Sequence, residues 1–163
     1  MHNALKKVIL VVVLIVISCA FSYYLGLRRG EGILDEFVGE FPLSGFNADI
    51  CESSLRYFFD HNESAAKNNA EAYYVLIHGH NPTPEFLERF QGSSPPVKKG
   101  SAYRETDLQI LFKIQNYESP ADGQWLVRIS YREGPLSAST HELLLVKNDG
   151  RWTITKDTPT SLQ

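Results

Sequence analysis

The 163-residue chain is poor in cysteine and has no acidic residue among its first thirty positions. Its two cysteines are Cys19, inside a long apolar run, and Cys51, so we expect no intrachain disulfide. Residues 31–163 carry 12 basic and 19 acidic side chains, a net charge of −7. No basic stripe interrupts this acidic part. Nucleic acid is therefore excluded as an expected ligand, because binding its phosphates requires positive charge.

The longest apolar run has no charged residue. Val8 to Leu27 is twenty residues long, with Lys6 and Lys7 before it and Arg28 and Arg29 after it. At about 1.5 Å per residue a helix of this length spans roughly 30 Å, the thickness of a bilayer core. The run predicts a transmembrane helix, and residues 1–30 a membrane anchor or signal segment. We expect a single-pass protein of the inner (cytoplasmic) membrane that contacts the lipid bilayer through residues 8–27, with its C-terminal domain extracytoplasmic.

A second kind of anchor is also compatible with this run. The residues Val16-Ile17-Ser18-Cys19 resemble a bacterial lipobox, in which the cysteine is lipidated. The alternative is thus a lipoprotein lipidated at Cys19. Ala20 to Leu27 stays apolar, which favours an uncleaved anchor.

Helical spacing dominates the next part of the chain. Residues 31–48 are expected to form a juxtamembrane stalk, and residues 49–157 a folded domain. Three helices are predicted at the start of that domain: one capped by Asn47 or Asp49, one capped by Asn62 and ending at Gly79, and one from Thr83 to Gly92. They should cover one face of a sheet.

Strand patterns fill the second half of the domain. Apolar residues alternate with polar ones at Leu108 to Ile114 and again at Trp125 to Tyr131. A hairpin is predicted from His141–Val146 and Arg151–Thr155, closed by Asn148-Asp149-Gly150. Val97 to Arg104 predicts a short edge strand, and residues 158–163 a flexible tail.

The order of helices first and strands second, together with the terminal hairpin Leu143 to Ile154, resembles the nuclear transport factor 2-like superfamily. The resemblance covers Asp49 to Asp157 and is most specific in the hairpin, where an apolar run is followed by Lys147, Asp149-Gly150 and Trp152. It implies an α+β fold: here an N-terminal transmembrane helix followed by helices packed on a curved antiparallel sheet, a cystatin-like cone with a pocket at its open end. Trp125, Ile129, Leu145 and Ile154 should line the concave face.

The resemblance also implies candidate pocket residues. Enzymes of this superfamily place an acid or base among apolar side chains, and here Asp107 or His141 could serve as the base. The candidate ligand-pocket residues are aromatic: Tyr73, Tyr74, Tyr103, Trp125 and Tyr131. Aromatic side chains at helical or strand spacing are, however, typical of core packing. No residue matches a catalytic motif, so we assign none as catalytic.

His78-Gly79-His80 is a candidate metal site, which His61, Glu85 or His141 could complete. Nothing in the sequence fixes a third ligand, and we expect neither a metal nor a cofactor. The sequence favours a membrane-anchored extracytoplasmic binding or assembly module of a bacterial cell-envelope complex, non-catalytic and bound to a protein partner. The alternative is a small-ligand pocket protein, or a pocket enzyme of the isomerase or dehydratase type.

Overall fold

The computed structural model describes residues 39–105, 109–134 and 137–162. The chain divides into two units between Phe37 and Val38, and the fold described here belongs to the second.

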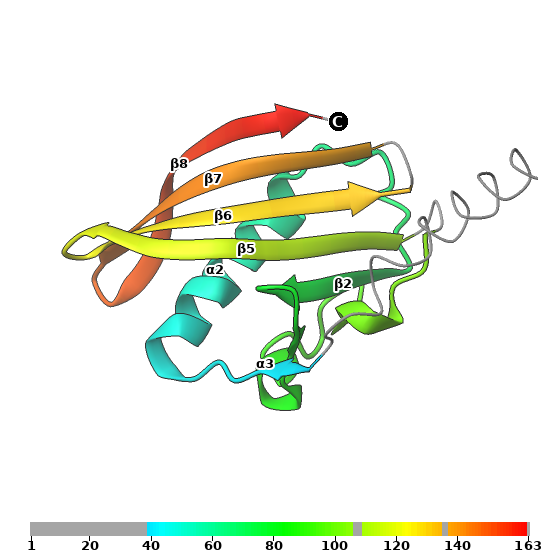
Figure 1. Cartoon of the computed structure of the whole chain (residues 1–163), viewed down its shortest axis with the longest axis horizontal. Helices are drawn as coiled ribbons and strands as arrows, with labels where there is room; N and C mark the ends of the chain where they lie inside the picture. The colour runs from blue at the N-terminus through cyan, green and yellow to red at the C-terminus, as the bar shows by residue number, and fades with distance from the viewer. Residues whose placement is uncertain (1–38, 106–108, 135–136, 163) are drawn as a thin grey trace, which may run out of the picture. The chain divides into compact units, whose positions relative to one another are not determined.

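A mixed six-stranded sheet is the frame of this unit (Figure 1). The strands, in their order across the sheet, are β4 (Val97–Lys99), β2 (Ala72–Ile77), β5 (Gln109–Ala121), β6 (Gln124–Glu133), β7 (Ser137–Asn148) and β8 (Arg151–Leu162). β2 runs parallel to both of its neighbours, β4 and β5, whereas β5 to β8 form an antiparallel meander. A separate two-stranded parallel pair joins β1 (Glu40–Phe41) to β3 (Asn81–Pro82).

The meander forms where period-two alternation predicts strands. Gly123, with a φ of 72°, turns β5 into β6, and Asp149 and Gly150 turn β7 into β8 with φ values of 48° and 80°. Positive φ at both central positions suits the right-handed twist of a two-residue hairpin, which explains the Asp-Gly pair. The two predicted alternating strands, so far as they lie in the described residues, and the terminal hairpin are confirmed. The edge strand predicted for Val97 to Arg104 is confirmed only at Val97–Lys99, and a 3-10 helix follows at Gly100–Ala102.

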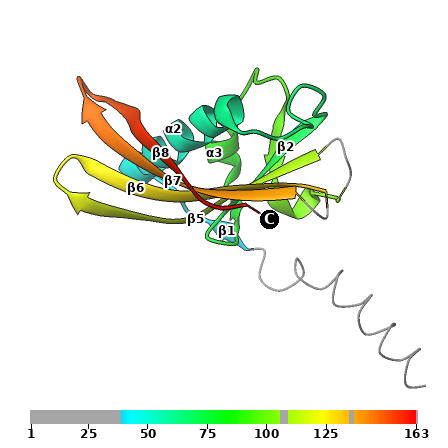
Figure 2. The same cartoon turned by 90° about the horizontal axis from the view of Figure 1, so that it is seen from above.

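One long helix, α2 (Gly45–His61), packs on one face of the sheet (Figure 2). Apolar residues at helical spacing give this helix one inward face, whose side chains are all buried: Ile50, Cys51, Ser54, Leu55, Phe58 and Phe59. The Asn62 side chain ends the helix by donating to the carbonyls of Phe58 and Phe59. The short helix α3 (Pro84–Glu88) begins at Thr83, whose hydroxyl accepts from the Phe86 amide, as predicted.

The core lies between α2 and this sheet face. Ile129 and Leu145 are fully buried in it, and Trp125 and Ile154 pack against it half-buried. The four side chains predicted to line the concave face therefore do share one apolar cluster with α2. Phe58 and Phe112 meet edge to face with ring centroids 6.1 Å apart, which ties the helix to the middle of the sheet.

Glu133, at the end of β6, holds the loop that follows α2. Its carboxylate accepts from the backbone amides of Ala65 and Ala66 at 3.1 and 2.8 Å, from the Ser137 hydroxyl at 2.9 Å, and from the Ser64 hydroxyl. Burial alone would raise the pKa of Glu133, but the hydrogen bonds together outweigh it and lower that pKa below its ordinary 4.5.

The predicted fold class is wrong in two respects. The helix expected between Asn62 and Gly79 does not form: Ala72–Ile77 is strand β2, with all six residues buried. A strand buried on both faces is apolar throughout and lacks alternation, so its sequence also fits a helix. Among the described residues, most of the regular secondary structure is strand, and α2 is the one long helix. The sheet is mixed rather than antiparallel.

The expected membrane helix also needs correction. Within residues 39–105, 109–134 and 137–162, no helix combines the length and apolar composition that crossing a bilayer requires. Residues 8–27, on which the expectation rests, lie outside the described residues. The structure therefore gives no support to a transmembrane helix, a single-pass protein or an inner-membrane localisation.

Two expected boundaries also differ. The stalk predicted for residues 31–48 contains β1, and α2 already starts at Gly45. The flexible tail predicted for residues 158–163 is strand as far as Leu162, because β8 pairs with β7 up to the partners Ser139 and Leu162.

Candidate functional site

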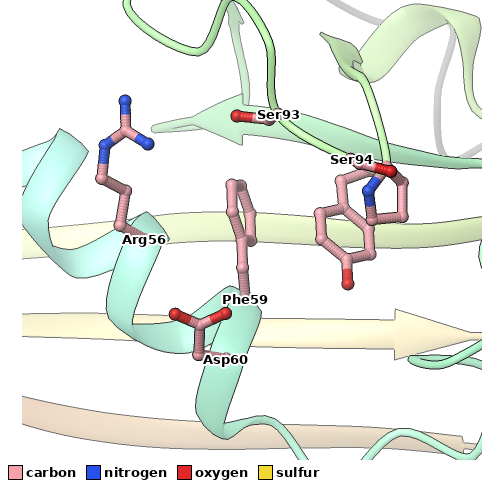
Figure 3. A pocket seen from close by; sticks show the side chains of 7 residues that line it. Arg56, Phe59, Asp60, Ser93 and Ser94 are labelled. Atoms are coloured by element: carbon pink, nitrogen blue, oxygen red, sulfur yellow. The ribbon is translucent and has the colours of Figure 1, made fainter.

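A cavity of about 240 Å³ opens between α2, β2 and the loop before β4 (Figure 3). Arg56, Phe59 and Asp60 come from the second half of α2, and Tyr73 comes from the start of β2. Ser93, Ser94 and Pro95 close it from the facing loop. We call this cavity the α2 pocket. Its base is aromatic, since Phe59 and Tyr73 are 8% and 6% exposed with ring centroids 4.8 Å apart.

The basic group at the rim of the α2 pocket is already engaged. The Arg56 guanidinium donates to the Glu52 carboxylate at 2.8 Å and to the Arg89 carbonyl at 2.5 Å, and it lies 4.9 Å from the centre of the Phe90 ring. Arg89 in turn bridges Asp49 and Glu52 at 2.8 and 2.9 Å. This network orients Arg56, and Glu52 offsets part of its positive charge.

Asp60, unlike Arg56, has a side chain that is not engaged in an ion pair within the described residues. The Lys67 ammonium donates to the backbone carbonyl of Asp60 instead. Burial, followed by the negative charge of Asp60, raises the pKa of Tyr73 above its ordinary value. The pocket thus combines the phenyl ring of Phe59, the neutral phenol of Tyr73 and the accessible carboxylate of Asp60.

The five predicted pocket residues do not converge. Tyr73 lines the α2 pocket, and Tyr131 is buried in the core beneath α2, 5.9 Å from the Phe58 ring. Tyr74 and Tyr103 belong to a separate cluster, with ring centroids 5.7 Å apart. Trp125 is half-buried beside Tyr117. Side chains alternate across a strand, so the neighbours Tyr73 and Tyr74 face opposite sides of the sheet.

His141, one of the two candidate bases, belongs to a buried polar chain. Its Nδ1 lies 2.7 Å from Asp157 Oδ1, and its Nε2 lies 2.9 Å from the Ser139 hydroxyl. The Tyr57 hydroxyl donates to the other Asp157 oxygen at 3.3 Å. Ser139 and His141 are two residues apart on β7 and so share a face, and β8 brings Asp157 beside them. We call these four side chains the His141 network.

The order serine, histidine, aspartate is that of a hydrolase triad, but burial argues against that role here. Ser139 and His141 are 3% and 6% exposed, and the Phe58 ring packs edge-on against the imidazole at 4.9 Å. A serine nucleophile needs room for a substrate carbonyl and donors for the oxyanion. The network instead satisfies the polar atoms of a histidine enclosed by α2 and the sheet, as buried polar groups require. Asp107, the other candidate base, lies outside the described residues.

The two histidines of the candidate metal site have structural contacts. His78, in the left-handed conformation with a φ of 51°, and His80 both contact the Phe41 ring, with centroids 5.0 and 6.1 Å away. Among the described residues, no group of three or more His, Cys, Asp or Glu side chains could hold a metal ion. Burial raises the pKa of the Cys51 thiol to about 12, and Cys19 lies outside the described residues.

Sequence reasoning missed most of the α2 pocket. The sequence predicts Tyr73 as a pocket residue but gives no such role to Phe59, Asp60 or Ser93 to Pro95. The one available signal was the loop's proline and serine content, which places it on the surface without showing what it faces. No family model matches the chain, and neither a curated protein nor a solved structure matches it.

Proposed function

We propose that the domain is a non-catalytic binding module whose α2 pocket receives a lysine or arginine side chain of a protein partner. The observation that carries this proposal is the placement of the Asp60 carboxylate beside the aromatic base formed by Phe59 and Tyr73. Aromatic faces attract cations, and a carboxylate completes the recognition of a basic group.

The size of the α2 pocket supports a side chain as its occupant. Its volume of about 240 Å³ is below the 300 to 1,000 Å³ typical of small-molecule sites. A lysine or arginine side chain has an apolar stem to lie on the rings and a charged end for Asp60. The hydroxyls of Ser93 and Ser94 stand at the other side, where they can accept from the same group or from the partner's backbone.

Net charge supports the same class of partner. Residues 31–163 carry a net charge of −7, which attracts a basic surface over a distance and speeds its encounter with the domain. The engagement of Arg56 by Glu52 limits local repulsion of an incoming cation.

We also propose membership of the nuclear transport factor 2-like superfamily. The supporting features are a long helix before the sheet, the antiparallel meander, and the terminal hairpin of β7 and β8. The non-catalytic role fits the burial of Ser139 and His141 in the His141 network.

The test is a titration of the isotope-labelled full chain with two capped tripeptides, one with a central lysine and one with a central norleucine. Norleucine has nearly the same stem without the charge. We expect the lysine peptide to shift the amide signals of Phe59, Asp60 and Ser94, and to bind on the order of fivefold to tenfold more tightly. Asp60→Asn should remove that difference, whereas the control Asp122→Asn, in the exposed turn between β5 and β6, should leave it unchanged.

Equal binding of the two peptides by the unsubstituted protein would refute the role given to Asp60. Shifts confined to another surface would refute the α2 pocket as the site.

A further inference from the structure

A second hollow of about 240 Å³ lies on the sheet face opposite α2. Phe112 and Ile129 point into the core beneath the helix, so their neighbours Lys113 and Ser130 point to the other face. The pairing of β5, β6 and β7 sets Lys113 opposite Ser130, and Ser130 opposite Thr140, in one row. Arg132 lies two residues further along β6 on the same face. We call this the outer hollow.

The outer hollow contains two basic side chains. Arg132 donates to Glu105 at 2.8 Å and to the Gly134 carbonyl at 3.2 Å, so part of its charge is compensated. Lys113 is half-buried, and within the described residues it forms no ion pair. Burial, followed by the charge of Arg132, lowers the pKa of Lys113. An anion entering the hollow would offset the repulsion between Lys113 and Arg132 and favour the charged form of Lys113.

Hydroxyl groups complete the lining. Ser130 is 8% exposed, and its oxygen accepts from the Gln115 amide at 3.2 Å, which leaves its own proton available for donation. Thr140 places a second hydroxyl beside it on β7. Directly opposed residues on neighbouring antiparallel strands have Cβ atoms about 5 Å apart, so Lys113, Ser130 and Thr140 can contact one small group together.

We propose that the outer hollow is a binding site for a small oxyanion, a carboxylate or phosphate group, with Lys113 as the principal charge and Ser130 and Thr140 as hydroxyl donors. Arg132 adds a second positive charge, which its ion pair with Glu105 partly compensates. Charge-assisted hydrogen bonds of this kind are roughly twice as strong as neutral ones. The site is independent of the α2 pocket, because the sheet separates the two.

The experiment titrates the isotope-labelled full chain separately with inorganic phosphate and with acetate, at constant ionic strength. We expect the amide signals of Lys113, Ser130 and Thr140 to shift with a saturable dependence on one or both anions. The preferred anion identifies the chemistry: tighter binding of phosphate indicates a phosphorylated ligand, and tighter binding of acetate a carboxylate ligand.

Substitutions test which residues bind the anion. Lys113→Gln should weaken binding about tenfold, and Thr140→Val, which keeps all charges, should weaken it about threefold. The control Lys98→Gln, on the exposed edge strand β4, should have no effect, and neither should Asp60→Asn, so failure here and failure of the α2 pocket are distinguishable. Thermal melts of each variant verify folding. Unshifted signals in the hollow, or unchanged affinity in both folded variants Lys113→Gln and Thr140→Val, would overturn the proposal.

Discussion

Replacing Asp157 by alanine should destabilise the domain. The substitution removes the 2.7 Å hydrogen bond to His141 Nδ1 and leaves that nitrogen buried without a partner, a cost of about 1 to 3 kcal/mol. The lost contact with Tyr57 is weak at 3.3 Å, and the half-buried Tyr57 hydroxyl can turn to water, so it adds about 0.5 kcal/mol or less. We expect a total of about 2 kcal/mol, which lowers the Tm by on the order of 5 to 10 °C.

Urea unfolding monitored by tryptophan fluorescence measures this loss. Asp157→Asn keeps an oxygen that can accept from the imidazole and should cost about 1 kcal/mol or less. In a double-mutant cycle, Asp157→Ala and His141→Ala together should cost less than the two separately by about 1 kcal/mol or more. Asp122→Ala, at an exposed turn, is the matched control and should change stability by less than about 0.5 kcal/mol.

Two results would refute this account of the His141 network. Additive effects in the cycle would show that the two side chains do not interact. An ester hydrolysis activity that Ser139→Ala abolishes at unchanged stability would show that the network is catalytic.

The other predictions concern stability and reactivity. Glu133→Gln should reduce stability at pH 7 and remove part of the acid sensitivity. A carboxylate with a lowered pKa stabilises the fold above about pH 4.5 and loses that contribution as the pH falls through the lower, folded-state pKa. The free energy of unfolding, measured with urea from pH 7 to 3, should therefore fall less steeply in the variant. Gly100→Ala should cost about 1 to 3 kcal/mol, because its Cβ would lie 2.3 Å from Leu76 Cγ; a Tm equal to that of the parent protein would contradict the packing described. In a Cys19→Ser variant, Cys51 is the sole thiol. It should react with a thiol reagent at pH 8 only as fast as the protein unfolds, since burial raises the pKa of its thiol to about 12. Rapid labelling of Cys51 would show that it is accessible.

The parts of the fold that the sequence predicted correctly are those where one face is buried and the other is not. Apolar residues recur at helical spacing from Ile50 to Phe59 and alternate with polar ones from Trp125 to Tyr131, because each element has a single apolar side. β2 has no such contrast. Its side chains pack against α2 on one face and cluster with Tyr103 and with Leu111 of β5 on the other. Ala72–Ile77 is therefore uniformly apolar, and its period is hidden.

The candidate sites were only partly predictable for a related reason. The spacing of Ser139 and His141 already places both on one side of a strand. Their meeting with Asp157 depends on the register of β7 with β8, which shifts at two irregularities, between Thr140 and His141 and between Leu144 and Leu145. Those shifts leave no clear sequence signal. The α2 pocket depends on where the loop at Ser93 to Pro95 folds back against α2, which is a tertiary contact.

Hydrogen exchange of the full chain with and without a lysine-rich peptide tests the central claim most directly, because it reports on every surface at once. Binding of a basic side chain in the α2 pocket predicts slower exchange in residues 56–60 and 93–97, with β5 and β6 unchanged, and loss of that protection in Asp60→Asn. Protection that survives Asp60→Asn, or that appears along β8 instead, would contradict the assignment of the α2 pocket as the binding site.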